Sequence, residues 1–455
     1  MRWIDDLLRR GEESEIRFVG GQPLTMQRLR NEVERLTALF GHLGVRGGTS
    51  VAVQVPPSFT FLFAVLALWR RDAEVLLLDH RSSATDRARL LALRGSSLLL
   101  RSSGGRLVRD FTDECELVIE RRPNGHHSAR HALVQRSSGT TGTPKIVCRS
   151  ASSLRREIVC TAAVPGMPRE GDRVLLLNSV ISSFGLLGGI LHALHNRSVV
   201  VFPAGSGPDA IAARAQTARA DVIFGAPFHF ELLSRLPEGA TTAPVRLAVS
   251  SGDTVHREVY ERFRDRFGIR IGQAYGTTET GLLAIDPAGL RPPPVLGTGT
   301  GNVRLRLSGG ELLARLPRST VIYDEDATAH RPRWLRTHDR VEKAPDGALV
   351  LRGRTGSARE IGGLLVDLTE VENVVRGHEK VAEVVAFFDG QTISAQVSAP
   401  ADLQPGELIR FCATRLDPRA VPRVITVVRH ELAKTSSGKL IRFPQPSISR
   451  RFSHS

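Results

Sequence analysis

The chain is poor in cysteine, aromatic residues and long apolar runs. Only 5% of its 455 residues are aromatic, and it has four cysteines: Cys115, Cys148, Cys160 and Cys412. These cysteines lie far apart and form no Cys-x-x-Cys pair, so the sequence encodes neither a disulfide framework nor a zinc ribbon. Unpaired cysteines fit a reducing compartment, and we expect a cytoplasmic protein.

The start of the chain and its longest uncharged stretch argue against secretion and membrane insertion. Asp5 and Asp6 stand where a signal peptide needs apolar residues. Residues 174–194 contain no Asp, Glu, Lys or Arg over about the length that spans a bilayer, but Asn178 and His192 interrupt them. We therefore predict a buried strand followed by a tightly packed helix, and no membrane span.

Basic residues outnumber acidic ones, 62 Lys and Arg against 47 Asp and Glu, for a formal charge of +15. Charged residues are nevertheless only 24% and apolar ones 41%, which excludes a disordered polyelectrolyte and allows a large core. The excess is scattered, so it reflects either a bias toward arginine or an acidic or polyanionic partner. A nucleic-acid-binding protein is an alternative that depends on charge alone. We expect no nucleic acid, because aromatic residues do not alternate with the basic ones.

Short apolar runs alternate with longer helical patterns, which is typical of α/β layering. Residues 24–43 and 59–70 have helical periodicity, while 51–55 and 74–78 read as buried strands. The same alternation recurs downstream, with strands expected at 197–202, 221–224 and 246–250 and helices at 208–218 and 228–236.

The sequence pattern changes after Gly281, where prolines and glycines become frequent and short strand-like runs follow at 303–307 and 311–316. A run rich in Gly and Arg from 353 to 363 then separates this body from about one hundred further residues. We predict an α/β fold with a large N-terminal domain of layered sheets and a small β subdomain (1–353), a hinge (354–357) and a small mobile C-terminal α+β domain (358–455).

The strongest local motif is a loop of glycines and small hydroxylated residues closed by a lysine, Ser137-Ser138-Gly139-Thr140-Thr141-Gly142-Thr143-Pro144-Lys145. Glycines let backbone N–H groups approach an anion, hydroxyls donate further hydrogen bonds and lysine adds a positive charge, so the loop suits a polyphosphate. Pro144 and Ile146 flank the lysine where P-loop NTPases need Gly and Ser or Thr. A flexible linker is the alternative, disfavoured because the loop lies between two apolar strands.

This loop resembles the phosphate loop of the adenylate-forming superfamily, which includes acyl-CoA synthetases, adenylation domains of nonribosomal peptide synthetases and firefly luciferase. Further segments match the superfamily's motifs in its order: Ser251-Gly252-Asp253, Ala274-Tyr275-Gly276-Thr277-Thr278-Glu279, Arg336-Thr337-His338-Asp339, Gly353-Arg354 and Lys434-Thr435-Ser436-Ser437-Gly438-Lys439. They extend over about residues 24–442, and the chain resembles a stand-alone acyl- or aryl-acid ligase.

The resemblance implies a site for ATP and Mg²⁺ in which positive charge helps a carboxylate attack the α-phosphate. Its implied catalytic residues are Lys439, which would bridge carboxylate and phosphate, Thr278, which would hydrogen-bond that phosphate, and Glu279, which would hold Mg²⁺. The implied ATP- or AMP-binding residues are Ser137, Ser138, Gly139, Thr140, Thr141, Gly142, Thr143, Lys145, Ser251, Gly252, Asp253, Ala274, Tyr275, Gly276, Thr277, Asp339 and Arg354. Among these, Tyr275 would lie against adenine, and Asp339 with Arg354 would grip the ribose.

The resemblance also bears on the substrate. Amino-acid-activating relatives pair the α-ammonium with an Asp, and here our alignment puts Ser183 at that position. Without that anion an ammonium would be buried unpaired, so we expect an aliphatic or aromatic carboxylic acid rather than an α-amino acid. The expected pocket residues are Ser183, Phe184, Leu187, Ala274, Leu282 and Leu283, any of which could instead be simple core residues.

The usual acceptor in the superfamily is a thiol, either coenzyme A or the phosphopantetheine of an acidic carrier protein, and Gly363 could line the tunnel for its arm. Both acceptors are anionic, so charge cannot choose between them. Three departures put the acceptor in doubt: His338 replaces a glycine, Gly356 replaces the usual hinge Asp or Lys, and no basic residue follows Gly363 directly. Transfer to an amine therefore stays an alternative. A catalytically silent nucleotide-binding paralogue is disfavoured because Lys439, Glu279 and Asp339 are all present.

Overall fold

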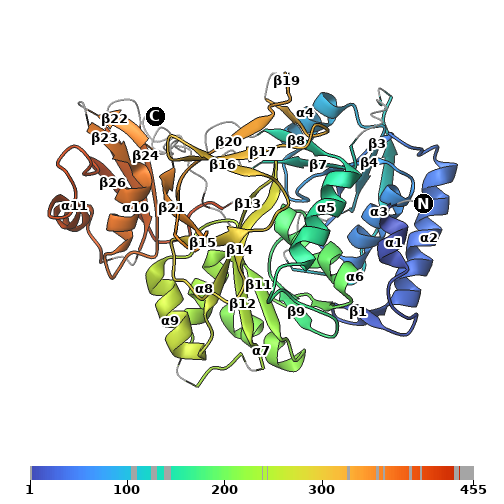
Figure 1. Cartoon of the computed structure of the whole chain (residues 1–455), viewed down its shortest axis with the longest axis horizontal. Helices are drawn as coiled ribbons and strands as arrows, with labels where there is room; N and C mark the ends of the chain where they lie inside the picture. Colours follow the sequence, from blue (N-terminus) through green and yellow to red (C-terminus); the bar gives the residue numbers. More distant parts are fainter. Residues whose placement is uncertain are drawn as a thin grey trace, which may run out of the picture. The chain divides into compact units, whose positions relative to one another are not determined.

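A computed structural model gives the structure of the chain (Figure 1). It describes residues 3–103, 110–123, 125, 131–137, 145–237, 239–242, 244–324, 328–354, 358–361, 364–388, 392–399, 402–434 and 440. These residues form two compact units. The larger unit extends to Leu351, and the smaller unit holds residues 338–340 and those from 352 onward.

Two sheets form the frame of the larger unit. In spatial order, the first contains β16 (Leu305–Ser308), β17 (Glu311–Arg315), β20 (Trp334–Lys343), β21 (Leu349–Arg354), β15 (Val295–Gly299), β14 (Gly281–Asp286), β13 (Ile271–Thr277), β12 (Leu247–Ser251), β11 (Val222–Gly225), β9 (Arg173–Leu176), β10 (Val199–Val201), β1 (Ile16–Val19) and β2 (Pro23–Thr25). The second contains β19 (Ala329–His330), β18 (Val321–Tyr323), β8 (Ile146–Arg149), β7 (Leu133–Arg136), β4 (Glu74–Leu77), β3 (Ser50–Gln54), β5 (Leu98–Arg101) and β6 (Val118–Arg121).

Helices follow the strands in the alternation that the sequence predicts. They are α1 (Trp3–Leu8), α2 (Met26–His42), α3 (Phe59–Arg70), α4 (Ala84–Arg94), α5 (Ala151–Ala162), the π-helix η2 (Phe184–Leu191), α6 (His192–Asn196), α7 (Pro208–Thr217), α8 (Pro227–Ser234) and α9 (Arg257–Phe267). Side-chain caps fix several of their first turns. Thr25, Ser58, Ser83 and Ser150 each accept a hydrogen bond from the backbone N–H three residues further on.

One apolar cluster joins both sheets to α3, α5 and η2. Helix α3 is apolar on every side and is buried over almost its whole length, as expected for a helix enclosed between layers. On the other face of the first sheet, α8 and α9 pack Phe230 and Phe263 against Ile223, Ala248 and Ile271 of β11, β12 and β13 (Figure 1). The helical cover on both faces explains why these parallel strands are apolar throughout.

The uncharged stretch 174–194 folds as predicted, as the buried strand β9 followed by a packed helix. Glycines make this packing possible. A Cβ added at Gly185 would lie 2.1 Å from the carbonyl oxygen of Ser179, and one at Gly189 would lie 2.8 Å from Leu176 Cδ2. Within the described ranges, no helix is both long and apolar enough to cross a bilayer.

The smaller unit contains β22 (Ala358–Ile361), β23 (Leu364–Asp367), α10 (Leu368–Arg376), β24 (Glu383–Phe388), β25 (Ile393–Ser398), α11 (Pro405–Ala413) and β26 (Val424–Val428). Strands β24, β25 and β26 form one sheet, and α10 and α11 bury Val371, Val375 and Leu408 in a core of their own. Together the units confirm the predicted fold, a large α/β body with small β strands and a small C-terminal α+β part.

Candidate functional site

The loop of small residues connects two antiparallel strands, β7 and β8. Arg136 of β7 pairs with Ile146 of β8, so residues 137–145 close a hairpin. Its two ends are tied to each other, because the N–H of Ser137 donates to the carbonyl oxygen of Lys145 over 2.8 Å and the N–H of Lys145 donates to Ser137 Oγ over 3.1 Å. These bonds fix the two ends of the loop beside each other. The expected residues Ser138, Gly139, Thr140, Thr141, Gly142 and Thr143 lie outside the described residues.

A second hairpin, β13–β14, carries Thr278 and Glu279 in its turn. The turn is held from inside: Thr277 Oγ1 and Thr280 Oγ1 lie 3.0 Å apart, and the N–H of Thr280 donates to Thr277 Oγ1 over 3.3 Å. Within the described part of the chain, neither Thr278 nor Glu279 has a side-chain hydrogen bond or ion pair. A hydroxyl and a carboxylate are therefore available together at this turn.

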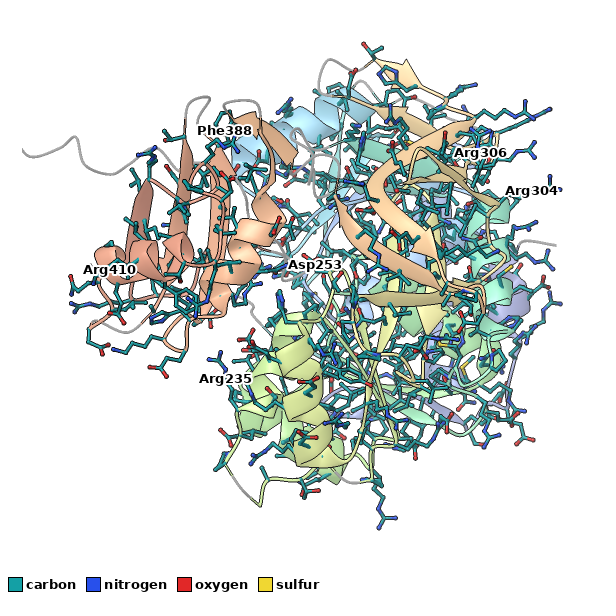
Figure 2. The ribbon with its side chains drawn as sticks, turned by 60° about the vertical axis from the view of Figure 1, so that its left-hand side comes forward. Arg235, Asp253, Arg304, Arg306, Phe388 and Arg410 are labelled. Atoms are coloured by element: carbon teal, nitrogen blue, oxygen red, sulfur yellow. The ribbon has the colours of Figure 1, made fainter. Side chains whose placement is uncertain are left out.

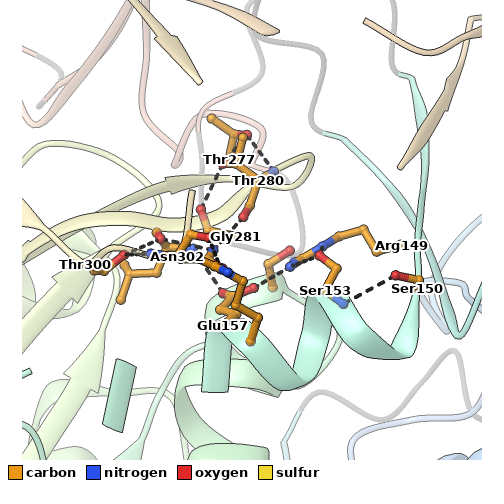
Figure 3. A network of polar contacts seen from close by, with 12 residues as sticks. Arg149, Ser150, Ser153, Glu157, Thr277, Thr280, Gly281, Thr300 and Asn302 are labelled. Atoms are coloured by element: carbon orange, nitrogen blue, oxygen red, sulfur yellow. Dashed lines mark hydrogen bonds and ion pairs between the residues drawn. The ribbon is translucent and has the colours of Figure 1, made fainter. Parts of the chain in front are cut away.

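Helix α5 links the two hairpins through a buried ion pair. Arg149 ends β8, and its Nη2 donates to Glu157 Oε2 over 2.7 Å (Figure 3). The other carboxylate oxygen of Glu157 accepts the N–H of Leu282, the second residue of β14, over 3.0 Å. Both charged side chains are almost completely buried. We call Arg149, Glu157 and this bond to Leu282 the α5 clamp.

Gly281 fits the clamp for two reasons. Its φ of +72° lies in the left-handed region that glycine tolerates, and a Cβ there would stand 1.9 Å from Glu157 Oε2. The loop before β16 holds the same hairpin from its other side, since Asn302 Nδ2 donates to the carbonyl oxygen of Thr280 over 2.9 Å and Thr300 Oγ1 to that of Leu282 over 2.9 Å. The strand next to the turn of Thr278 and Glu279 is thus held by Glu157 on one side and by the loop of Thr300 and Asn302 on the other.

The residues expected near adenine meet at the carboxyl ends of β12 and β13. Ser251 and Ala274 are register partners in the parallel pair and are both buried. Gly252 has a φ of +97° with open space where a Cβ would stand, and Asp253 beyond it is exposed. Tyr275 is half-buried on the next position of β13. Carboxyl ends of parallel strands are the usual ligand edge of such sheets.

Asp339 and Arg354, both in the smaller unit, form an ion pair with each other. Arg354 Nε lies 3.1 Å from Asp339 Oδ1, and Asp339 is buried. His338 beside them adopts a φ of +61°, a conformation that favours glycine. The departure from the superfamily's glycine at this position therefore keeps the backbone turn and adds a side chain.

Three of the expected substrate residues, Ser183, Phe184 and Leu187, lie at the start of η2. Ser183 Oγ donates to Gln135 Oε1 over 3.0 Å, and Gln135 Nε2 donates to the carbonyl oxygen of Ile181 over 2.7 Å. Phe184, Leu187, Ala274 and Leu282 belong to one apolar cluster. Leu283 projects to the other face of β14 and packs with Leu296 and Leu312 instead.

The other candidate residues limit the kinds of chemistry that the site can perform. Gly363 and Lys439 lie outside the described residues. Within the described ranges no group of three or more His, Cys, Asp or Glu residues could hold a metal ion. Burial raises the pKa of the Cys148 thiol to about 12 and that of Cys412 to about 11, so neither serves as a thiolate nucleophile. At the ends of the two hairpins, the described residues include the hydroxyl of Thr278 and the charge of Lys145, which suit phosphate oxygens, and the carboxylate of Glu279, which suits a cation bound to them.

Comparison with known families agrees with this chemistry. Residues 8–319 match the family described as AMP-binding enzyme, and residues 370–439 match the AMP-binding enzyme C-terminal domain. The chain belongs to the AMP-binding enzyme family. It is an adenylate-forming ligase related to aryl- and acyl-CoA ligases.

Relatives of this AMP-binding enzyme include the 4-hydroxybenzoate–CoA/benzoate–CoA ligase of Rhodopseudomonas palustris, 26% identical over 97% of this chain and 92% of that protein. The oxalate–CoA ligase of Arabidopsis thaliana is 24% identical over 92% of each chain. Two solved structures share the fold: the o-succinylbenzoate coenzyme A synthetase of Bacillus subtilis (TM-score 0.77, 20% identity, 97% of both chains) and a benzoate CoA ligase of Burkholderia xenovorans (TM-score 0.76, 20% identity, 97% and 99%).

The sequence analysis missed the residues whose hydrogen bonds and ion pairs hold the hairpins of this AMP-binding enzyme in place. Arg149, Glu157, Asn302 and Gln135 belong to no motif. Arg149 and Glu157 did carry a signal, because charges directly after an apolar strand and inside an amphipathic helix must be paired if both are buried. Only the fold reveals that they are.

Proposed function

We propose that this AMP-binding enzyme activates an aromatic or aliphatic carboxylic acid, not an α-amino acid, as an acyl-adenylate with release of pyrophosphate. The acyl group then passes to a thiol. One observation carries the choice of acid: Ser183, beside the apolar cluster of Phe184, Leu187 and Leu282, is bound to the neutral amide of Gln135. A neutral wall gives an ammonium group no counter-charge. Relatives named for benzoate and 4-hydroxybenzoate support the same acid class.

For the first step, the β7–β8 loop with Lys145 would hold the phosphates, and Thr278 would donate to the α-phosphate. The unpaired carboxylate of Glu279 fits Mg²⁺, which commonly binds through one or two carboxylates together with phosphates. When bound, Mg²⁺ neutralises charge on the phosphate oxygens. Lys439 would bring a cation to the carboxylate and the α-phosphate. Its role is assigned by resemblance to the superfamily's terminal motif.

For the second step, we propose that residues 358–455 act as a domain that turns about a hinge at 354–357, with residues 1–353 as the fixed body. Gly363 would line the channel for the arm of coenzyme A or of a carrier's phosphopantetheine. We favour coenzyme A because the relatives named above are CoA ligases. The four cysteines form no disulfide, which supports the expected cytoplasmic location.

An acid panel tests the proposed function. Exchange of labelled pyrophosphate into ATP is measured with benzoate-like acids, short aliphatic acids and the twenty amino acids in turn, and the product mass is then determined with coenzyme A, a carrier protein or an amine. We expect exchange with an aryl or alkyl acid and a CoA thioester. Exchange with amino acids only would refute the acid class, and an amide formed without coenzyme A would favour the non-thiol acceptor.

The variant Lys439→Ala tests the lysine separately. We expect acid-dependent exchange to fall below detection, because no other cation would bridge the two anions, while transfer from a supplied acyl-adenylate is retained. If the variant exchanged as fast as the parent enzyme, the assignment of Lys439 would be wrong.

A further inference from the structure

A cluster of arginines lies on one face of the sheet end formed by β16, β17 and β20. In the β16–β17 pairing Arg306 is opposite Leu313, and the N–H of Arg315 donates to the carbonyl oxygen of Arg304 over 2.9 Å. Because side chains alternate along a strand, Arg304, Arg306 and Arg315 share one face. Figure 2 shows Arg304 and Arg306 together at the outer edge, well separated from the Asp253 loop.

None of these three guanidinium groups has an acidic partner in the part of the chain that the structure describes. The buried carboxylate of Glu311 on the same sheet end is taken by Arg336, whose Nη2 lies 2.5 Å from it. Within the described residues, Arg304, Arg306 and Arg315 form no ion pair. Exposed arginines elsewhere commonly do: Arg235 lies 2.7 Å from Glu231, Arg257 2.9 Å from Glu261 and Arg264 2.6 Å from Asp265. The cluster thus places three unpaired guanidinium groups of the described chain on one face.

Placing like charges opposite each other costs stability in the isolated chain. An anionic partner would remove this cost. The aromatic ring of Trp334 contacts the cluster, and the guanidinium of Arg306 covers it at 4.6 Å, which leaves that face of the ring unable to stack on a base. Leu307, on the opposite face of β16 from the arginines, is 39% exposed. Arginine is among the residues that are enriched at protein interfaces.

The shape of this edge favours an extended partner. Among the described strands β16 is the last in its sheet, so its outer backbone groups have no neighbouring strand. A segment that pairs with β16 would place every second side chain beside Arg304 and Arg306. A second copy of β16 would bring arginine against arginine, so self-association at this edge is disfavoured.

We propose that the β16 edge binds an extended acidic segment of another protein as an added strand, with carboxylates beside Arg304 and Arg306 and apolar residues alternating between them. Backbone hydrogen bonds supply affinity and the arginines supply selectivity for acidic side chains. The proposed binding to this edge does not depend on which acid or acceptor the enzyme uses.

The probe is a labelled peptide of about eight residues in which glutamate and valine alternate, titrated against the full chain by fluorescence anisotropy at low salt and at about 0.15 M salt. We expect saturable binding that weakens with salt, and a loss of about tenfold or more for Arg304→Gln/Arg306→Gln. The matched control Arg262→Gln/Arg270→Gln removes the same charge from two other exposed, unpaired arginines and is expected to bind like the parent. A peptide methylated on alternate backbone nitrogens is expected not to bind.

The charge-reversed variant Arg304→Glu/Arg306→Glu keeps the test decisive if the neutral variant folds poorly, because it is expected to prefer a lysine–valine peptide. No binding to the parent enzyme overturns the proposal. So does an equal loss in the control variant, which would indicate net charge alone, or undiminished binding of the methylated peptide, which would exclude strand addition. Tighter, arginine-dependent binding of duplex DNA or of phosphatidylserine vesicles would assign the edge to those anions instead.

Discussion

Replacing Glu157 by glutamine tests whether the α5 clamp positions the turn of Thr278 and Glu279. The substitution keeps the shape of the side chain but removes its charge. If the amide oxygen still accepts the N–H of Leu282, its NH₂ group faces Arg149 Nη2, donor against donor. The guanidinium of Arg149 is 1% exposed and already has one nitrogen, Nη1, without a partner. It would lose its counter-charge as well.

The expected destabilisation follows from this burial. Removing one partner of a buried ion pair costs about 3–5 kcal/mol. The larger unit has about 345 residues, and at about 2.1 cal/mol/K per residue a loss of about 4 kcal/mol lowers its melting temperature by about 5 °C. A turn displaced by about 1 Å costs up to about a hundredfold in rate. We therefore expect a drop in the rate of pyrophosphate exchange of about ten- to a hundredfold.

The chain offers a matched control in Glu74→Gln. Glu74 is completely buried at the start of β4, with Arg94 Nη2 2.7 Å away. Glu74 lies at the end of the β4–β7 pair away from the small-residue loop, and its hydrogen bonds run to Arg94 and His131 rather than to the β13–β14 hairpin that the α5 clamp holds. We expect both variants to melt earlier by similar amounts, measured by calorimetry, and only Glu157→Gln to exchange slowly at a temperature where both are folded. Equal rates in the two variants would refute a positioning role.

Three further outcomes are expected. Gly281→Ala should be markedly less stable and slower in exchange than Gly268→Ala, because the two glycines have similar φ values, +72° and +69°, but only at Gly281 would the new Cβ meet another atom. Burial, with a smaller effect of a neighbouring histidine, lowers the pKa of His192 to about 3. Between pH 6.5 and 3 the unfolded chain therefore binds a proton that the folded chain does not. The free energy of unfolding is therefore not reduced by His192 above pH 6.5, and it declines by about 1.4 kcal/mol per pH unit as the pH falls below that value. In His192→Gln this decline with pH should be flatter. Asp339→Asn, which weakens the pair with Arg354, should raise the KM for ATP about tenfold at nearly constant kcat.

Each outcome has a direct check. Urea unfolding compares the two glycine variants. Equal free energies of unfolding would mean that the carboxylate of Glu157 moves away from the new Cβ without loss of stability, which would contradict the prediction. The same method at pH 7 and pH 5 compares the parent enzyme with His192→Gln, and parallel declines would exclude this histidine as the source. Initial rates at varied ATP test Asp339→Asn. A fall in kcat with an unchanged KM would contradict a role in nucleotide binding.

Much of the fold could be predicted from the sequence because the local sequence patterns agree with the tertiary environment of the segments. Residues 59–70 were predicted as a helix and form α3 with the same bounds, since the segment is apolar on all sides and begins after a capping serine. The residues of the substrate pocket could be predicted from the sequence only in part. Leu282 and Leu283 look equivalent in the sequence, but neighbouring residues of a strand face opposite sides, so Leu283 joins a different cluster from Leu282.

By itself the sequence determined the class of the fold and the order of the nucleotide motifs, because hydrophobic periodicity and glycine-rich loops act over a few residues. The tertiary structure decided which charges support the site. Arg149 and Glu157 are eight positions apart and each is unremarkable alone, yet burial makes them an ion pair, and a strand more than a hundred residues away completes the clamp. Burial and long-range pairing depend on the whole fold, which no local pattern specifies.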